Sequence, residues 1–283
     1  MSALEDRVAL VTGAGVNLGR AMALSLLGAG AKVCLTSLRE DELAEVVAAS
    51  GADAVRAHAI AADIGNSEGR ARIVSEALDR FGHVDVLINN AAITPETFWP
   101  DWLATGEPRQ WTLTDDFYRH FLEVNSVAPH AFIAALVPRM LERGWGRVVN
   151  VTTSLDTMLA FWPYGSAKAA LEAQTASLAK QLEGSGVTAN VLIPGGFTKP
   201  KPLHLTGGEV VMPAFQPQIM AAPVHWLASR DSDGVNARRI LASRWSAELP
   251  WQRAWQTATF PIAWSEYGER AVSPELQQEV AAR

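Results

Sequence analysis

The chain has 283 residues, 48% of them hydrophobic, and a formal net charge of −6 at pH 7, which indicates one globular domain over residues 1–283 because no linker-like stretch divides it. No basic run could neutralise a phosphate backbone and no apolar run approaches transmembrane or signal length, so we expect no nucleic-acid partner, no membrane span and a cytoplasmic location. The single cysteine, Cys34, excludes an internal disulfide, and we expect no metal site.

The N-terminal stretch has the order of a nucleotide-binding unit. A β-branched strand at 7–11 runs into the glycine turn Thr12-Gly13-Ala14-Gly15-Val16-Asn17-Leu18-Gly19, and a helical pattern follows from Arg20 to Gly28. Glycines let the backbone approach a pyrophosphate, and the helix that follows offers it free N–H groups. A glycine turn between a strand and a helix is also an ordinary connection, so this motif alone does not decide the function.

Further strand and helix patterns follow at regular spacing. Apolar strands are expected at 31–37, 55–61 and 84–92, and they alternate with helices at about 40–50 and 67–81. This alternation predicts an α/β fold, in which a doubly wound parallel sheet of about seven strands carries helices on both faces. Two polar sites follow strands at their carboxyl ends, where such sheets bind ligands. These sites are Asp63 and the run Asn89-Asn90-Ala91-Ala92.

The segment from 93 to 113 interrupts this rhythm with three tryptophans and three prolines. It is either a surface loop held by its own aromatic side chains or an apolar wall over the substrate end of a pocket. A long helix is then expected from about Asp115 to Arg143. Pro129 lacks a backbone donor and should bend this helix near 124–129, where Asn125 lies.

The stretch from Val151 to Lys168 contains side chains suited to proton transfer. Tyr164 and Lys168 are four residues apart at the start of an alanine-rich helix, so they share one helix face. A fixed ammonium favours the phenolate and would lower the pKa of the tyrosine from about 10. Tyr164 could then exchange a proton with a substrate oxygen held by the hydroxyl of Thr153 or Ser154. A tyrosine and a lysine at this spacing also occur on helix surfaces without any catalytic role.

The C-terminal part is the least regular. A sixth strand ends in Pro194-Gly195-Gly196, and a seventh is expected at 239–244. Residues 249–267 carry three tryptophans, a phenylalanine and a tyrosine, within an aromatic-rich extension at about 246–283. These side chains either pack on the protein's own core or on a neighbouring subunit, or they close a substrate pocket.

Taken together, these motifs resemble those of the short-chain dehydrogenase/reductase family, whose members have a single-domain Rossmann fold. The similarity runs from about Asp6 to Leu205, and more loosely to about Trp245. The family's glycine motif matches Thr12, Gly13 and Gly19, its adenine-contacting aspartate matches Asp63, its NNAG matches Asn89 to Ala92, its helix asparagine matches Asn125, its YxxxK matches Tyr164 and Lys168, and its PG turn matches Pro194 and Gly195.

The resemblance implies hydride transfer between a nicotinamide and a small-molecule alcohol or carbonyl. Tyr164 would be the acid/base, Lys168 would lower its pKa and bind the nicotinamide ribose, and Asn125 would hold a water in a proton relay. Because members of the family assemble through helices equivalent to 115–143 and 164–183, a homodimer or homotetramer is expected. The expected cofactor-binding residues are Gly13, Asn17, Leu18, Gly19, Ser37, Arg39, Asp63, Ile64, Asn90, Ala91, Ala92, Tyr164, Lys168, Pro194, Gly195, Gly196, Phe197 and Thr198.

Three positions depart from the family pattern. Asn17 replaces the middle glycine, and asparagine tolerates a positive φ better than most residues do. Ala92 replaces the glycine of NNAG. The family's catalytic serine aligns with Thr153, which Ser154 follows, and the loop before Tyr164 is shortened. Either hydroxyl can donate to a carbonyl oxygen, so both remain candidates.

The choice of cofactor depends on the end of the second strand. An acidic residue there binds the ribose 2′-OH of NAD, and a basic residue accepts the 2′-phosphate of NADP. The strand ends in Thr36-Ser37-Leu38 and Arg39 follows, which favours NADP over NAD. Glu40 and Asp41 come next and keep NAD as the alternative.

Two functions compete. The favoured one is an oxidoreductase that acts on an apolar ketone or secondary alcohol, with Tyr164 as the acid/base. The alternative is a catalytically silent NAD(P)-binding sensor or scaffold of the same fold, which would fit the departures at Asn17 and Ala92. Retention of Lys168 and Asn125 beside the tyrosine favours the enzyme, because a sensor needs no acid/base pair.

Overall fold

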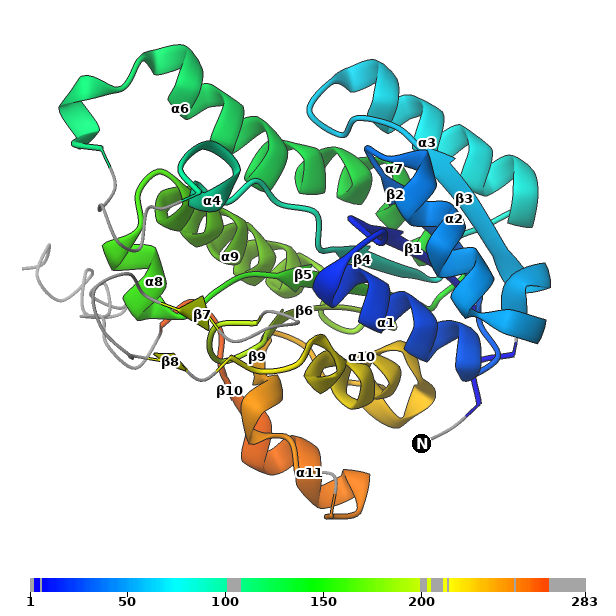
Figure 1. Ribbon diagram of the computed structural model, residues 1–283. Helices are drawn as coiled ribbons and strands as arrows, with labels where there is room; N and C mark the ends of the chain where they lie inside the picture. The colour runs from blue at the N-terminus through cyan, green and yellow to red at the C-terminus, as the bar shows by residue number, and fades with distance from the viewer. Residues whose placement is uncertain are drawn as a thin grey trace, which may run out of the picture.

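A computed structural model describes residues 3–5, 7–100, 108–198, 203–204, 211–212, 214–246 and 248–264. Its centre is an eight-stranded sheet in the order β10-β9-β6-β5-β4-β1-β2-β3 (Figure 1). Seven strands are parallel, and β10 pairs with β9 in the antiparallel sense. The strands are β1 Val8–Thr12, β2 Lys32–Ser37, β3 Ala57–Ala61, β4 Val86–Asn89, β5 Gly146–Val151, β6 Val187–Ile193, β9 Arg238–Leu241 and β10 Thr259–Pro261, and a separate pair is formed by β7 Leu203–His204 and β8 Val211–Met212.

Helices cover both faces of the sheet (Figure 1). On one face lie α1 Asn17–Gly28, α2 Glu40–Ala49 and α10 Ala221–Ala228, and on the other lie α3 Ser67–Phe81, α7 Ala128–Glu142 and α9 Tyr164–Gln181. The main hydrophobic clusters divide in the same way, one around Leu26 and Trp226, the other around Phe132 and Met140. Every residue of β1, β5 and β6 is buried, as is expected for parallel strands covered on both sides. The predicted doubly wound α/β fold is confirmed.

The strand order changes direction beside β1. From β1 the chain adds β2 and β3 on one side, and then crosses to the other side to add β4, β5 and β6. The carboxyl ends of β1 and β4 therefore flank the topological switch point, where open α/β sheets bind their ligands.

The long helix expected from Asp115 to Arg143 consists of three segments. α6 spans Asp115–Leu122, a π-helical turn spans Glu123–Val127, and α7 follows. The predicted irregularity is confirmed. It is a π-helical turn, which contains one more residue than an α-helical turn and ends shortly before Pro129.

The same stretch is the one candidate membrane span among the described residues. Asp115–Glu142 is long and apolar enough to cross a membrane by length and composition, although the sequence analysis found no run approaching that length. Of its most apolar window, 56% is buried inside the protein. Its apolar residues therefore face the sheet and neighbouring helices, as in the core helix of a globular fold.

Around the expected loops, the structure contains several short elements. Phe98 is the last residue of the short helix α4, Pro95–Phe98, and its ring contacts those of Phe117, Phe121 and Trp99 at centroid distances of 4.9, 5.6 and 6.1 Å. The described part of segment 93–113 is thus held by aromatic packing, while residues 101–107 lie outside the described residues. The short helices are α4 Pro95–Phe98, α8 Leu155–Ala160 and the 3₁₀ turns Gly51–Arg56, Gln110–Thr112, Pro217–Met220, Arg230–Ser232 and Ala242–Arg244.

The C-terminal segment packs on the protein's own core as far as it is described. The strand expected at 239–244 ends at Leu241, because a 3₁₀ turn takes over from Ala242. Helix α11, Trp251–Ala258, follows, and its Trp255 ring stacks on Trp226 with a centroid distance of 5.5 Å and an interplanar angle of 14°. Residues 265–283, which include the last aromatic residue of the tail, lie outside the described part.

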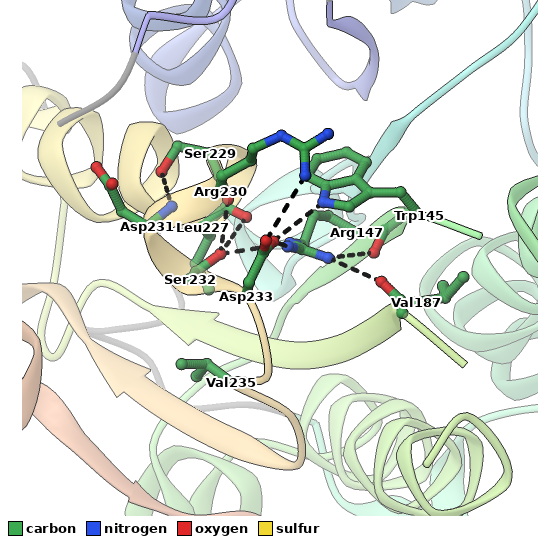
Figure 2. A network of polar contacts seen from close by, with 12 residues as sticks. Trp145, Arg147, Val187, Leu227, Ser229, Arg230, Asp231, Ser232, Asp233 and Val235 are labelled. Atoms are coloured by element: carbon green, nitrogen blue, oxygen red, sulfur yellow. Dashed lines mark hydrogen bonds and ion pairs between the residues drawn. The ribbon is translucent and has the colours of Figure 1, made fainter. Parts of the chain in front are cut away.

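A network of polar groups around the buried Arg147 lies at the amino end of β5 (Figure 2). Arg147, with a 1% exposed side chain, pairs with Asp233 and donates from Nε to Ser232 Oγ at 3.3 Å. The Trp145 indole donates to Asp233 Oδ1 at 3.0 Å, and the guanidinium carbons of Arg147 and Arg7 lie 4.1 and 3.6 Å from the centre of its ring. Burial lowers the pKa of Arg147 to about 10. This network fastens the loop before β9 to β5, at the end of the sheet opposite the switch point.

Candidate functional site

The glycine loop after β1 is shaped for close backbone contact. Gly13 has φ +64°, and a Cβ on it would lie 2.8 Å from Ala91 Cα, while a Cβ on Gly19 would lie 2.0 Å from the Gly13 carbonyl oxygen. Asn17 adopts φ +49°, so the expectation that this residue keeps the left-handed turn is confirmed. Its side chain donates to Thr198 O at 3.3 Å, which joins the loop to the segment after β6.

The residues after β4 hold this loop in place. Thr12 Oγ1 accepts hydrogen bonds from the backbone N–H groups of Asn90 and Ala91, each at 3.0 Å. In return, Asn90 Nδ2 donates to the carbonyl oxygens of Thr12 and Gly13 at 2.9 and 3.2 Å. Asn90 therefore fixes the position of the glycine loop. Ala92 is exposed, so its methyl group causes no steric conflict with the core.

These features fit a dinucleotide. The loop offers a surface that side chains would fill, and α1 begins at Asn17 without a described side chain capping its first N–H groups. Such a helix N-terminus favours an anion such as a pyrophosphate. The residues that could hold it are therefore Gly13, Asn17, Leu18 and Gly19.

Asp63 follows β3 and already has two intramolecular partners. Its Oδ1 accepts from the N–H of Gly65 at 2.7 Å and its Oδ2 from Asn66 Nδ2 at 3.2 Å. Ile64 is buried, and its carbonyl oxygen accepts from Arg70 at 2.8 Å. A carboxylate has further lone pairs, so Asp63 can brace the turn into α3 and still accept from a ligand.

At the end of β2, the structure shows a pairing that the sequence analysis missed. Arg39, expected there as a cation for a phosphate, lies 2.5 Å from Asp41 and 3.3 Å from Glu42. Ser37 Oγ donates to Glu42 Oε2 at 3.2 Å, and a Cβ on Gly15 would lie 2.8 Å from the same oxygen. Glu42, in the first turn of α2, is therefore the carboxylate that contacts Ser37 and lies beside the glycine loop, whereas the sequence analysis named Glu40 and Asp41.

The turn after β6 lies beside the glycine loop, and these two segments together are called the glycine cradle below. Pro194 O accepts from the N–H of Ser243 at 3.0 Å, and a Cβ on Gly195, whose φ is +89°, would lie 2.0 Å from Ser243 Oγ. A Cβ on Gly196 would lie 2.9 Å from the Phe215 ring, and Phe197 O accepts from the N–H of Phe215 at 2.7 Å. The backbone from Pro194 to Thr198 is thus fixed beside the glycine loop.

Tyr164 is the first residue of α9, and Lys168 lies one turn later. The lysine Nζ is 5.8 Å from the centre of the tyrosine ring and donates to Val151 O at 2.8 Å. Burial, with a smaller contribution from Glu96, raises the pKa of Tyr164 above its ordinary value of 10.0. Burial also lowers the pKa of Lys168 from 10.5 to about 7.

These pKa values correct the expectation of an acidified phenol. Burial raises the pKa of the tyrosine because it disfavours the charged phenolate, and burial likewise disfavours the charged form of Lys168. Glu96 of α4, which the sequence analysis did not single out, adds a repulsion to the phenolate. A carboxylate in a loop of mixed polarity gives no sequence signal that it will face the tyrosine.

The two candidate hydroxyls differ in their surroundings. Ser154 Oγ caps α8, where it accepts from the Thr157 N–H at 3.2 Å and lies 2.9 Å from Thr157 Oγ1. For Thr153, the backbone is fixed: its carbonyl oxygen accepts a hydrogen bond from Arg239 Nη2 at 2.5 Å. The segment before Tyr164 contains the helix that Ser154 caps.

Asn125 lies in the π-helical turn and is fully buried. Its Nδ2 donates to Ile93 O at 3.1 Å, while its Oδ1 is buried without a partner among the described residues. Because buried polar atoms are nearly always satisfied, this oxygen is available to a water or ligand donor, as a proton relay requires.

Comparisons with known proteins agree with this geometry. A model of the short chain dehydrogenase family matches residues 7–201. An uncharacterized oxidoreductase of Mycobacterium tuberculosis is 36% identical over 200 residues, which cover 70% of this chain and 72% of the relative. A fluoren-9-ol dehydrogenase of a Terrabacter species is 28% identical over 297 residues, covering 96% and 82%. The crystal structure of a metagenomic short-chain oxidoreductase in complex with NADP has a TM-score of 0.68 and 26% identity, covering 85% of this chain and 98% of that one.

Proposed function

The chain belongs to the short-chain dehydrogenase family, and we propose that it is an oxidoreductase that interconverts an apolar ketone and its secondary alcohol with NADP(H). The observation that carries this proposal is the start of α9, where Tyr164 and Lys168 lie one turn apart and the lysine reaches the end of β5. A silent binding protein would need the glycine cradle alone. It would not need a buried lysine beside a tyrosine.

The cradle supplies the binding residues for the cofactor. The N-terminus of α1 would hold the pyrophosphate, Asp63 and Ile64 the adenine, and Lys168 the nicotinamide ribose. When bound, NADP(H) supplies or accepts the hydride. Support for NADP comes from the NADP complex of the similar metagenomic enzyme and from Ser37 and Arg39 at the end of β2, although Asp41 and Glu42 must release Arg39 before a 2′-phosphate can pair with it.

The protein's own part in the reaction is proton transfer and orientation. In the reducing direction Tyr164 donates its phenolic proton to the carbonyl oxygen, so its raised pKa keeps the proton in place until it is needed. The hydroxyl of Thr153 or Ser154 donates a hydrogen bond to the same oxygen and stabilises the negative charge that develops there. Asn125 Oδ1 would hold the water through which the tyrosine regains its proton.

Aromatic side chains near the tyrosine favour an apolar, flat substrate. Trp162 precedes Tyr164 by two residues, and its ring stacks on Tyr118 with centroids 5.1 Å apart and an interplanar angle of 25°. The Phe98 cluster lies on the adjoining helices α4 and α6. Similarity to a fluoren-9-ol dehydrogenase over nearly the whole chain supports the same substrate class, because a fused aromatic ketone matches such walls.

We further propose a cytoplasmic homodimer or homotetramer joined through α7 and α9. Light scattering coupled to gel filtration would measure its mass, and a monomer would exclude this assembly. The function itself is tested by following nicotinamide absorbance with aryl ketones, aliphatic ketones and their alcohols, with NADPH and NADH in parallel. Turnover of an aryl ketone by the wild type and its loss in Tyr164→Phe would support the proposal. Cofactor binding without turnover of any substrate would favour the silent sensor.

A further inference from the structure

A buried ion pair lies directly behind the proposed active site. Glu172 is on α9, one turn after Lys168, and its side chain is completely buried. Its Oε2 accepts from Thr152 Oγ1 at 3.0 Å, and its Oε1 accepts from Arg239 Nη1 at 3.1 Å. Arg239 belongs to β9 and has a side chain that is 9% exposed.

The arginine continues the network to the reactive turn. Its Nη2 donates to the carbonyl oxygen of Thr153 at 2.5 Å. One guanidinium therefore holds both the carboxylate on α9 and the backbone that follows β5. A planar group with five donors in fixed directions is suited to this double contact.

The C-terminal segment completes the set of contacts. The N–H of Ala263 donates to Glu172 Oε1 at 3.3 Å, and Ala263 and Trp264 adopt φ values of +55° and +52°. The left-handed conformation is unfavourable for residues with a Cβ. Such a conformation persists only where surrounding contacts determine it, and the hydrogen bond from Ala263 to Glu172 is one such contact.

Stability alone does not account for this pair. Replacement of a buried ion pair by apolar residues of similar volume is often neutral or stabilising, because desolvation offsets the attraction between the charges. Here the contacts of Glu172 and Arg239 join two segments that must be correctly positioned relative to each other for catalysis. These are α9, which carries Tyr164 and Lys168, and the turn that carries Thr153 and Ser154.

We propose that Glu172 and Arg239 are positioning residues that fix the Thr153–Ser154 turn relative to Tyr164, so that hydroxyl and phenol converge on one substrate oxygen. This inference rests on the proposed function. The pair touches neither substrate nor cofactor in this assignment. It acts through the turn and through α9.

The decisive variant is Glu172→Leu combined with Arg239→Met, which removes both charges and leaves no unpaired ion. We expect it to keep the thermal unfolding midpoint within a few degrees and the cofactor Kd within about twofold. Its kcat for the best ketone should fall about 10- to 100-fold with little change in KM, since small displacements of reacting groups have effects of this size. Full kcat in a variant with wild-type stability would overturn the proposal.

A second variant covers the case in which the double replacement does not fold. Arg239→Lys keeps a positive charge beside Glu172 but loses the planar contact with Thr153, so kcat should fall roughly 10-fold while the unfolding midpoint is retained. A fall in kcat that is matched by weaker cofactor binding or by lost stability would also contradict a positioning role.

Two controls separate this idea from the proposed function. Arg147→Met removes the buried arginine at the opposite end of the sheet (Figure 2), so it should lower the unfolding midpoint and leave kcat of the folded enzyme unchanged. If Arg147→Met lowers kcat as much as Arg239→Lys, the effect is general and the proposal fails. If Tyr164→Phe remains fully active, the proposed function fails instead.

Discussion

The Lys168 ammonium donates a hydrogen bond to Val151 O, 2.8 Å away, and thereby joins the first turn of α9 to the last residue of β5. This contact satisfies one of the three donors of the ammonium. Burial makes the charged form costly, which is why the pKa of this lysine falls to about 7. The charge of Lys168 is thus sensitive to pH in the range where the enzyme would work.

The first prediction concerns stability against pH. The folded pKa of Lys168, about 7, lies below its ordinary 10.5, so between these values the unfolded chain binds more protons and stability rises with pH. The slope from this group approaches about 1.4 kcal/mol per pH unit and vanishes below pH 7. Urea unfolding at pH 6 to 9.5 should show this rise in the wild type. Lys168→Met should lack it, whereas Lys180→Met, at an exposed position of the same helix, should retain it.

Replacement of Tyr164 by phenylalanine removes the proton and keeps the ring. We expect kcat to fall by about 10²- to 10⁴-fold, as is typical when a general acid is lost, with NADPH affinity unchanged. Stopped-flow turnover and quenching of tryptophan fluorescence by NADPH would measure the two quantities. Wild-type turnover in this variant would exclude the tyrosine as the acid/base.

Thr153→Val and Ser154→Ala separate the two hydroxyls. Removing the hydroxyl that holds the substrate oxygen should raise the activation free energy of the reaction by about 2.7–4 kcal/mol. Ser154→Ala should also destabilise α8 by about 1 kcal/mol, because Ser154 caps that helix. Comparing kcat with the unfolding free energy distinguishes these effects. If neither variant slows turnover, the substrate oxygen lies elsewhere.

The carboxylate of Glu42 should influence the choice of cofactor. We expect the wild type to bind NADPH more tightly than NADH, and Glu42→Gln to increase that preference, because it removes a negative charge beside Ser37 and one of the two carboxylates that pair with Arg39. Ser37→Asp should move the preference toward NADH by a few kcal/mol through repulsion of the phosphate. Fluorescence titrations with both reduced cofactors test this. A wild type that prefers NADH would mean that Glu42 accepts from the ribose 2′-OH.

Glu96 should shift the pH dependence of alcohol oxidation. Its charge contributes to the raised pKa of Tyr164, and oxidation requires the phenolate. Glu96→Gln should therefore move the rising limb of kcat/KM to lower pH. Glu68→Gln, at an exposed position on α3, serves as the matched control. An unchanged profile in Glu96→Gln would show that this carboxylate does not reach the tyrosine in the working enzyme.

The fold was predictable because its signals are local. The left-handed turn at Asn17 follows from a preference of asparagine itself, and the irregularity before Pro129 follows from the missing N–H of proline. Alternating apolar strands and helices then determine a covered parallel sheet with little reference to distant residues. These features lie within a few residues of their causes.

The surroundings of the site could not be predicted in the same way. Arg239 and Glu172 are 67 residues apart, and neither residue carries a local sign of its partner. The raised pKa of Tyr164 comes from burial and from Glu96, which the spacing of Tyr164 and Lys168 does not reveal. Glu42 lies near Gly15 only because α2 folds back over the end of β2.

The antiparallel strand β10 has a consequence for the solution behaviour of the protein. It pairs with β9 through Thr259 and Ile240, and through Pro261 and Arg238. A chain ending before Thr259 would leave that side of β9 with unpaired N–H and C=O groups, which form a template for strand addition by another molecule. Such a shortened chain would retain every proposed catalytic residue and still tend to aggregate.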